Sequence, residues 1–436
     1  MDFLAEYRRK LTTPESAVAT IAPRGAIGFG VATVQPPALL AALGARARAG
    51  DVRELAVYYT YAIAPLCESL LVPELLGVIR PRPTFLTAGD RKLIEASGSA
   101  ASVDYVPANL HQIPRLFEES IALDAFLVTV SPMDRFGYLS LGTCIGYSAA
   151  AARSAKRLIV EVNERMPRTL GDTMLHVSEI DAIVEHTAPL AAFAPRAPSD
   201  VDHAIGERIA ALIGDGATLQ LGIGGVPDAV AACLADRREL GIHTELLTPG
   251  MMRLVQSGVV TGTRKRTFRR KHVFTLAIGD EAFYDFMHDN PALEGQPCSV
   301  TNDPASIAAN DHAVSINSIL EVDLYGQVNA EFLDHHEFSG VGGQHDFVRG
   351  AYRSHGGKSF LAFHSTAHGG TVSRVVPRLD GVVTDPRMDV HYLATEHGVV
   401  DLKGRSTRER AELIISIADP AFRDDLEREA KKRQLL

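Results

Sequence analysis

Short apolar runs rich in β-branched residues alternate along this chain with longer stretches of helical periodicity. The segments LIVEV at residues 158–162 and VFTLA at residues 273–277 are examples of the short runs. Such runs are typical of buried strands, and their alternation with helices is typical of βα units around a largely parallel sheet. The sequence therefore predicts an α/β protein.

The length and composition predict more than one domain. The chain has 436 residues, of which 46% are hydrophobic and 22% are charged. This balance is ordinary for a globular protein with a substantial core and does not indicate disorder. Because a domain usually holds about 150 residues, two or three domains fit this length, and two large ones fit best.

A segment rich in proline and alanine at residues 187–199 interrupts the alternation. Its three prolines disfavour regular structure, and helical periodicity resumes at Asp200. We therefore expect a domain boundary there, with an N-terminal domain at residues 1–190 and a C-terminal domain at residues 200–436.

The two predicted domains share a weak repeat. The sequence AIGFGVATVQPPALLAAL at residues 26–43 aligns without gaps on ATLQLGIGGVPDAVAACL at residues 217–234, so that Pro36 matches Pro227. Chance similarity between two apolar segments is the alternative, because alanine and leucine are common. The matching position of the two segments within each half favours duplication.

The charge, cysteines and hydropathy limit the partners. A formal net charge of −9 argues against a general nucleic-acid-binding protein. The four cysteines form no CxxC pair, so neither a zinc site nor a disulfide framework is indicated. A polar N-terminus and the lack of an apolar run of about 18 residues predict a cytoplasmic protein without a membrane segment, acting on small molecules.

A glycine-rich turn in the second half is the first candidate for a binding site. Residues 217–221 are strand-like, and residues 228–240 have helical spacing with Pro227 at a suitable first turn. Glycines between them permit a ligand to approach the N–H groups at the helix start, where anionic or polarised oxygens bind. A turn needed only for close packing is the alternative, because this glycine pattern is not specific. The candidate residues are Gly222, Ile223, Gly224, Gly225 and Val226.

Glu245 follows this helix, in the short β-like stretch GIHTELLTPG at residues 241–250. Its carboxylate is expected near the carboxyl end of a strand, which is the edge of an open α/β sheet where ligands bind. There it suits a nucleophile, a general base or a metal ligand. A surface glutamate in an ion pair is the alternative from the pattern alone.

A second glycine-rich loop, FSGVGGQHDF at residues 338–347, follows the strand-like segment SINSILEVDL. The N–H groups of Gly342 and Gly343, together with those of the first loop, suit an oxyanion hole, in which each donor typically contributes about 2.7–4 kcal/mol to acyl transfer. A plain β-turn is the alternative. The side chains of Asn317 and Gln344 either bind a ligand amide or satisfy neighbouring backbone groups.

Two further features carry less specific signals. The basic residues between Arg264 and Lys271 suit the phosphates of a nucleotide-like ligand, although such runs are more often solvated loops. His335, His336 and His345 lack the HxxxH spacing and the organised carboxylate partner of a metal centre, so we expect no metal site.

Ordered motifs run through both halves of the chain. The first half contains SPMDRFGYLSLG and IVEVNERMPRTLGD. The second half contains GIGGVPDAV, HTELLTPGMMRLVQSGVVTG, VSINSILEVDLYGQVNAE, FSGVGGQHDFVRGA and TEHGVVDLKGRSTRERAELI. Together they resemble the acetyl-CoA hydrolase/transferase family, and specifically the class I CoA-transferases of the 4-hydroxybutyrate and butyrate:acetate type, over nearly the whole chain.

The resemblance implies two similar open α/β domains with largely parallel sheets, the class I CoA-transferase fold, and acyl-CoA and small carboxylates as substrates. It implies that Glu245 is the nucleophile, which carries CoA as a glutamyl thioester between two acids. Residues 222–226, Gly342, Gly343 and Asn317 are the implied CoA contacts and oxyanion donors. The family also implies a homo-oligomer, a dimer or tetramer, with no tightly bound cofactor.

The sequence departs from the family pattern beside the implied acyl pocket. Residues 247–250 read LTPG where relatives usually carry a Ser-Asp-Gly turn, and His345 replaces a small apolar residue. With Gln344, His345 is expected in the substrate pocket unless its side chain merely packs. A dicarboxylate acceptor such as succinate or itaconate is then expected beside 4-hydroxybutyrate, butyrate and acetate. An acyl-CoA hydrolase using the same Glu245 and a non-catalytic CoA-binding module are the alternative functions.

Overall fold

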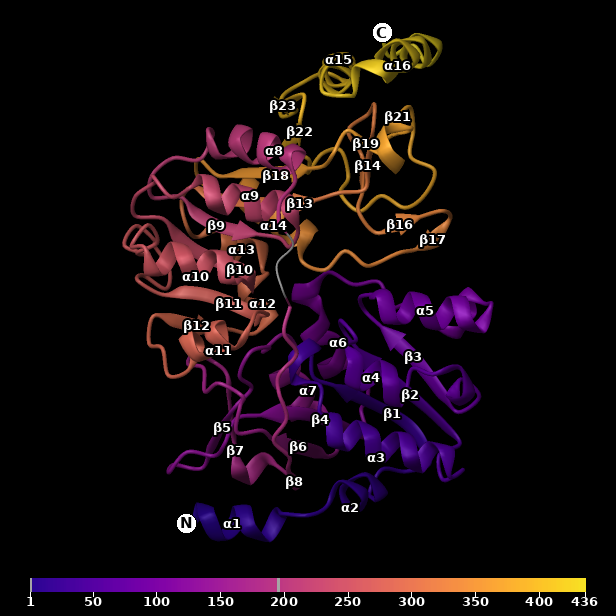
Figure 1. Cartoon of the computed structure of the whole chain (residues 1–436), viewed down its shortest axis with the longest axis vertical. Helices are drawn as coiled ribbons and strands as arrows, with labels where there is room; N and C mark the ends of the chain where they lie inside the picture. The colour runs from indigo at the N-terminus through magenta and orange to yellow at the C-terminus, as the bar shows by residue number, and fades with distance from the viewer. Residues whose placement is uncertain (1, 194–196) are drawn as a thin grey trace. The chain divides into compact units, whose positions relative to one another are not determined.

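The computed structural model describes residues 2–193 and 197–436, and the chain forms two compact units (Figure 1). The first unit takes in the described chain up to Phe193 together with Val273–Thr301. The second takes in the described residues from there to His272 together with Asn302–Leu436. Residues 194–196 of the predicted linker, including Pro195, lie outside the described residues.

The segment Val273–Thr301 differs from the sequence-based division, which assigned it to a C-terminal domain at residues 200–436. Its backbone bonds to loops of the first unit. The N–H of Ile145 donates to Thr275 O at 2.9 Å, and the N–H of Gly295 donates to Leu170 O at 2.8 Å. Pairing between residues so distant in the sequence leaves no local pattern, so the linker at residues 187–199 could not reveal it.

A parallel six-stranded sheet forms the centre of the first unit, in the order β3-β2-β1-β4-β6-β8. Its strands are β1 (Arg24–Phe29), β2 (Glu54–Tyr59), β3 (Ile79–Pro83), β4 (Ala125–Val130), β6 (Leu158–Val162) and β8 (Ala182–Glu185). A separate antiparallel pair consists of β5 (Tyr138–Ser140) and β7 (Met174–His176). The central strand β4 is buried at every residue, as expected for a sheet covered on both faces.

Helices surround this sheet, and the apolar side of α3 joins the strands in one core that includes Ile27, Leu40, Leu43 and Val57. The helices are α1 (Phe3–Lys10), α2 (Pro14–Ala19), α3 (Pro37–Arg48), α4 (Ala64–Ser69), α5 (Ala88–Ser97), α6 (Ile113–Glu119) and α7 (Ser148–Ser154). The 3-10 turns are η1 (Ala32–Val34), η2 (Pro73–Leu75), η3 (Ala100–Ser102), η4 (Leu110–Gln112) and η5 (Val177–Glu179). The later segment carries β11 (His272–Ala277), α11 (Glu281–Met287), β12 (Leu293–Gly295) and α12 (Cys298–Thr301).

The second unit also contains a largely parallel sheet, in which its strands follow the order β10-β9-β13-β18-β22-β23. Only the last of these pairs is antiparallel. The strands are β9 (Thr218–Leu221), β10 (Gly241–Leu247), β13 (Ala313–Ser318), β18 (Lys358–Ala362), β22 (Tyr392–Thr395) and β23 (Gly398–Asp401). Short strands beyond the sheet are β14 (Glu321–Asp323), β15 (Val328–Asn329), β16 (Phe332–Leu333), β17 (His336–Glu337), β19 (Thr366–Ala367), β20 (Val372–Ser373) and β21 (Val375–Val376).

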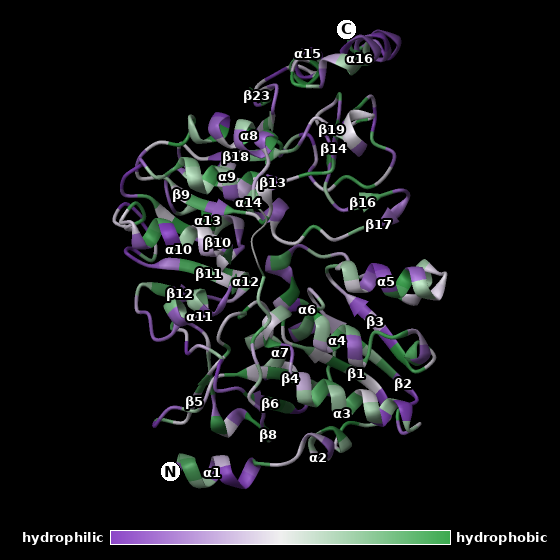
Figure 2. Ribbon diagram, viewed as in Figure 1, coloured by the Kyte–Doolittle hydropathy of each residue, from purple (hydrophilic) through white to green (hydrophobic). Residues whose placement is uncertain are grey.

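The helices of this unit are amphipathic or short. They are α8 (Asp200–Ala210), α9 (Gly225–Cys233), α10 (Pro249–Gln256), α13 (Pro304–Ala308), α14 (Gln344–Arg353), α15 (Thr407–Ser416) and α16 (Pro420–Lys432), with the 3-10 turn η6 (His368–Gly370). Figure 2 shows α16 mostly in purple, and its buried residues Leu426 and Ala430 join the core of this unit. In the described part of the chain, a helix long and apolar enough to cross a membrane is not found.

The strand orders of the two units agree with the predicted repeat. The series β2-β1-β4-β6-β8 of the first unit corresponds to β10-β9-β13-β18-β22 of the second. Because Ala26 aligns on Ala217, Ile27 corresponds to Thr218. Ile27 pairs with Val57 and Thr218 pairs with Gly241, so Val57 corresponds to Gly241. Counting along the chain from these two residues makes Tyr61 the counterpart of Glu245. Duplication therefore explains the topology of both sheets, and one copy alone carries a glutamate at this position.

The same registers make Leu361 on β18 the counterpart of Glu161 on β6. The fully buried carboxylate of Glu161 accepts the N–H groups of Leu39 at 2.9 Å and Ala38 at 3.3 Å, at the start of α3. It also lies 2.9 Å from Nδ1 of His186. A side chain from another strand thus caps α3, whose preceding Pro36 has no side-chain hydrogen bond to give.

Candidate active site

Glu245 lies on β10 near the carboxyl end of the strand, and its side chain is half-buried. Its Oε2 accepts a hydrogen bond of 2.9 Å from Nδ2 of Asn302, in the segment just before α13. The backbone N–H of Gly343 donates a second hydrogen bond to the same carboxylate. Two donors from different segments of the second unit therefore fix the carboxylate.

Gly343 leaves space for this arrangement because it has no side chain. A Cβ at position 343 would lie 1.8 Å from Oε2 of Glu245 and 2.0 Å from Nδ2 of Asn302. Its φ is −101°, a value open to any residue, so the backbone conformation does not require glycine here. The close approach of the carboxylate does require it.

Burial raises the pKa of Glu245 from 4.5 to about 7. The negative charge of Asp346, which is buried on α14, also raises this pKa, whereas the hydrogen bonds from Asn302 and Gly343 lower it. The carboxylate therefore gains and loses its proton near neutral pH. Its ionised form is only partly hydrated, which makes it a better nucleophile than a glutamate in water.

The first glycine-rich loop joins β9 to α9. The N–H of Gly222 donates to Ile316 O at 2.9 Å and holds the loop against β13. Gly224 precedes the helix with a φ of 120°, which favours glycine, and no side chain caps the helix start. A Cβ at Gly225 would lie 2.3 Å from Oδ2 of Asp202 on α8, so this glycine also allows close packing. Close packing therefore explains Gly225, and the helix start has no side-chain cap.

The structure of this loop differs from the sequence-based prediction in two respects. Ile223 is 56% exposed and available to a ligand, whereas Val226 is buried at 4%. The helix begins at Gly225 and ends at Cys233, although the spacing predicted helix over residues 228–240. The helix ends early because the chain turns after it, with Glu239 at a positive φ just before β10.

Asn317, on β13, uses its side chain within the protein. Its Nδ2 donates to Oε1 of Gln220 at 3.2 Å, and Nε2 of Gln220 donates back to its Oδ1 at 3.0 Å. This reciprocal amide pair holds β9 against β13, directly below the first glycine-rich loop. The side-chain amide of Asn317 therefore bonds another side chain and not a neighbouring backbone group.

Gln344 and His345 begin α14, immediately after Gly343, and each side chain contacts an aspartate. Nε2 of Gln344 donates to Oδ2 of Asp385 at 2.6 Å. Nε2 of His345 lies 2.9 Å from Oδ2 of Asp389. Each side chain therefore has one polar atom engaged by an aspartate, and both residues directly follow Gly343, whose N–H bonds Glu245.

The basic run at residues 264–271 is used mainly for structure. The buried Nζ of Lys265 donates to Ile242 O and Lys271 O, both at 2.8 Å. Arg264 pairs with Glu239, and Arg266 pairs with Asp311. His335 and His336 lie on an exposed hairpin, and the described residues contain no cluster of three or more side chains suited to a metal ion.

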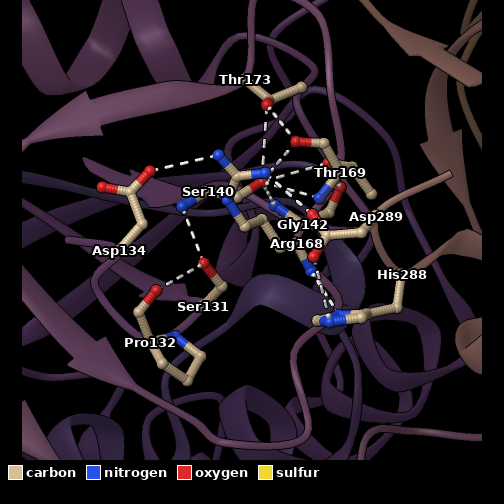
Figure 3. A network of polar contacts seen from close by, with 10 residues as sticks. All are labelled: Ser131, Pro132, Asp134, Ser140, Gly142, Arg168, Thr169, Thr173, His288 and Asp289. Carbon is tan, nitrogen blue, oxygen red and sulfur yellow. Dashed lines mark hydrogen bonds and ion pairs between the residues drawn. The ribbon is translucent and has the colours of Figure 1, made fainter. Parts of the chain in front are cut away.

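The two first-half motifs meet in a polar network of the first unit (Figure 3). Ser140 Oγ accepts the N–H of Thr169 at 3.2 Å. Arg168 donates to Oδ2 of Asp134 at 3.1 Å and to Oδ1 of Asp289 at 2.8 Å. These motifs therefore fix three loops of the first unit to one another.

Asn302 and Asp346 act on Glu245 but were not among the predicted site residues. Asp346 stands inside the second glycine-rich motif, where an acidic residue beside Gly343 was a usable signal. Asn302 follows Glu245 by 57 residues and belongs to no motif. Its sequence, Asn-Asp-Pro, indicates only a helix start, and Asp303 indeed caps α13.

Comparison with known proteins covers both halves of the chain. Residues 1–195 match the model of the acetyl-CoA hydrolase/transferase N-terminal domain, and residues 279–430 match that of the C-terminal domain. The chain is 42% identical over 436 residues to a 4-hydroxybutyrate coenzyme A transferase of Clostridium kluyveri, covering 99% of this chain and 100% of that protein. It is 36% identical over 453 residues to a butyryl-CoA:acetate CoA-transferase of Anaerostipes caccae, covering 100% and 99%.

A solved structure has the same fold. RipA from Yersinia pestis matches with a TM-score of 0.96 at 48% identity, over 100% of both chains. The two largely parallel α/β sheets and these matches identify an enzyme of the CoA-transferase class. The chain belongs to the acetyl-CoA hydrolase/transferase family and transfers CoA between acyl-CoA and carboxylates.

Proposed function

We propose that Glu245 is the covalent nucleophile of CoA transfer. Its carboxylate attacks the carbonyl carbon of the donor acyl-CoA, the C–S bond breaks, and CoA thiolate leaves a mixed anhydride on Glu245. The thiolate then attacks the glutamyl carbonyl, which releases the donor acid and forms a glutamyl-CoA thioester. The acceptor carboxylate runs the same two steps in reverse and leaves as its CoA ester.

One observation carries this proposal, namely that the missing side chain of Gly343 lets two N–H donors reach Glu245. Donors that hold a carboxylate also hold the oxyanion formed when thiolate or acceptor adds to the glutamyl carbonyl. Donors fixed in advance stabilise that oxyanion without reorganisation. The site is therefore suited to stabilise the oxyanion whether CoA thiolate or the acceptor carboxylate adds to the glutamyl carbonyl.

We propose that the loop at residues 222–226, with Gly342, contributes to the binding of the CoA ester. The uncapped start of α9 offers N–H groups to a polarised or anionic oxygen. Binding energy from parts of CoA remote from the sulfur is then available to lower the chemical barrier. Asn317 supports this loop from below through its pair with Gln220.

We propose short monocarboxylic acids as the preferred acceptors, such as 4-hydroxybutyrate, butyrate and acetate. The names of the two relatives indicate such acids. The second carboxylate of succinate or itaconate would need a free donor, whereas Nε2 of His345 already lies 2.9 Å from Oδ2 of Asp389. Rates of transfer from acetyl-CoA to all five acids test the choice, and faster transfer to the dicarboxylates would contradict it.

The nucleophile is identified by trapping. The protein is incubated with acyl-CoA alone, treated with borohydride or hydroxylamine, and the modified residue is located by mass spectrometry. We expect the modification at Glu245, and its absence there would refute the mechanism. Glu245→Ala should abolish transfer, and Glu245→Asp should lose most of it because the carboxylate is withdrawn by one methylene. Glu239→Gln, just before β10, is the matched control and should retain both the modification at Glu245 and the transfer activity.

The alternative of hydrolysis is tested in the same preparation. CoA release is compared with acyl exchange while acetate is added in graded amounts. A transferase releases little CoA without acceptor and responds to acetate, whereas a hydrolase releases CoA at a rate independent of acetate. The second result would assign water as the acceptor at Glu245.

We also propose a cytoplasmic homo-oligomer, a dimer or tetramer, as the family resemblance implies. Exposed apolar side chains of the second unit support association, among them Val372, Val382, Val383 and Met388. Light scattering coupled to size-exclusion chromatography measures the mass, and a monomer at micromolar concentration would contradict this proposal.

A further inference from the structure

Arg374 lies in the second unit between β20 and β21, where its backbone connects two elements of the site edge. Its N–H donates to Ser365 O at 2.9 Å, and its carbonyl accepts the N–H of Val322 at 3.0 Å. Ser365 follows β18, and Val322 belongs to β14, which follows β13. Figure 1 labels β14 and β21 close to one another, and these two strands pair in parallel. Arg374 is therefore anchored at the carboxyl edge of the sheet, where ligands bind in open α/β folds.

The guanidinium of Arg374 is half-buried, and it forms no hydrogen bond or ion pair with the described residues. Burial lowers its pKa, and the nearby charge of Glu396 opposes that effect. The carboxylate of Glu396 is already bonded to the N–H of Ser365 at 3.0 Å and to its Oγ at 2.6 Å, with His397 beside it. A partly desolvated arginine without a direct partner indicates an anion that binds there.

A chain of contacts connects Arg374 to the first glycine-rich loop. Ser365 adjoins His364, whose Nε2 lies 2.8 Å from Oδ1 of Asp202. The other oxygen of Asp202 lies against Gly225, where a Cβ would meet it at 2.3 Å. The loop and the arginine are thus held in fixed relation by α8 and the end of β18.

The distance from Glu245 to this edge suits the pantetheine arm of CoA. Glu245 is on β10, and the order β10-β9-β13-β18 separates it from the end of β18 by three strand spacings. At about 4.8 Å per spacing, this is roughly 14 Å. The pantetheine arm has the chain length of about four residues and extends to roughly 14 Å. An extended pantetheine arm at Glu245 therefore reaches as far as the end of β18, the strand followed by Ser365, whose carbonyl accepts the N–H of Arg374.

We propose that Arg374 binds a phosphate of the acyl-CoA substrate, an inference that rests on the proposed role of Glu245. The planar guanidinium offers two parallel N–H donors to two phosphate oxygens. The diphosphate bridge and the ribose 3′-phosphate of CoA share this chemistry. Both lie beyond the pantetheine arm.

The test compares Arg374→Gln with the wild-type enzyme on three donors, namely acetyl-CoA, acetyl-dephospho-CoA and S-acetyl-pantetheine. With acetyl-CoA we expect kcat/KM to fall about 10- to 100-fold, the usual effect of losing charge-assisted hydrogen bonds. With S-acetyl-pantetheine, which has no phosphate, we expect no change. A defect that persists with acetyl-dephospho-CoA assigns the diphosphate, and one that disappears assigns the 3′-phosphate.

Arg378→Gln is the matched control, because Arg378 is exposed on the same segment. It should leave kcat/KM for every donor unchanged. Arg374→Lys, which keeps the charge and the fold, should show a smaller loss on acetyl-CoA than Arg374→Gln. Unchanged kcat/KM of Arg374→Gln on acetyl-CoA, or an equal loss on S-acetyl-pantetheine, would overturn the proposal.

Calorimetric binding separates this proposal from the proposed catalytic role. The affinity of Glu245→Ala for free CoA is measured with and without Arg374→Gln. A weaker affinity in the double variant supports the phosphate contact even when trapping fails to label Glu245. Equal affinities would refute the contact while leaving the glutamyl mechanism intact.

Discussion

The proposed attack of Glu245 on a thioester requires the ionised carboxylate, but burial raises the pKa of Glu245 to about 7. Because kcat/KM reports the free enzyme, we expect it to rise with pH through about 7 and to level off above. Asn302→Ala removes a hydrogen bond that favours the ionised form and should move the rise to higher pH. Asp346→Asn removes a negative charge and should move it to lower pH. The pH profiles of kcat/KM for the wild-type enzyme and the two variants measure these shifts. A wild-type rise centred near pH 4.5 would disprove the assignment of this rise to Glu245.

The carboxylate of Glu245, and not the backbone conformation, restricts residue 343 to glycine. Gly343→Ala should fold normally, because a φ of −101° suits alanine, but its Cβ would displace Glu245 and Asn302. A shift of the nucleophile by about 1 Å lowers kcat about 10²-fold, and steady-state kinetics with thermal unfolding measure both properties. In Gly214→Ala the new Cβ would have no atom within 4 Å, so this control should retain activity. Full activity of Gly343→Ala would remove the main support for the site.

At the scale of elements, the two equivalent helices α3 and α9 differ in what satisfies their first N–H groups. Glu161 does so for α3, whereas no side chain does so for α9. Glu161→Ala leaves the N–H groups of Ala38 and Leu39 without their buried acceptor and should destabilise the first unit by about 1–3 kcal/mol. Glu161→Gln keeps one acceptor and should cost less. Hydrogen exchange of the α3 amides measures the change, with the exposed Glu164→Ala as control, and unchanged exchange in Glu161→Ala would contradict the capping role.

Elements that depend on local pattern were predicted well, and side-chain partners were not. The strand at residues 158–162 matches β6, and the helix resuming at Asp200 matches α8, because periodicity and capping are local. The first glycine-rich loop was predicted from its position between a strand and a helix. The choice of Gln220 as partner of Asn317, and of Asn302 as partner of Glu245, depends on which strands become neighbours. A sequence pattern does not report that.

At the scale of the whole molecule, the same strand order occurs in both units, but one copy has Tyr61 where the other has Glu245. We therefore expect a single covalently bound CoA per chain. The enzyme is saturated with acyl-CoA, the thioester is trapped, and the mass of the intact chain is measured. Two equivalents of modification would show that the first unit also has a reactive carboxylate.

The carboxylate of Glu161 beneath α3 has an evolutionary consequence. Once a domain has been duplicated, one copy can lose its ligand only if the buried groups that bound it find another partner. Glu161 provides that partner from within the chain, where the other copy has Leu361. Such an internal substitute allows one half of a duplicated enzyme to specialise as scaffold while the other half keeps the chemistry.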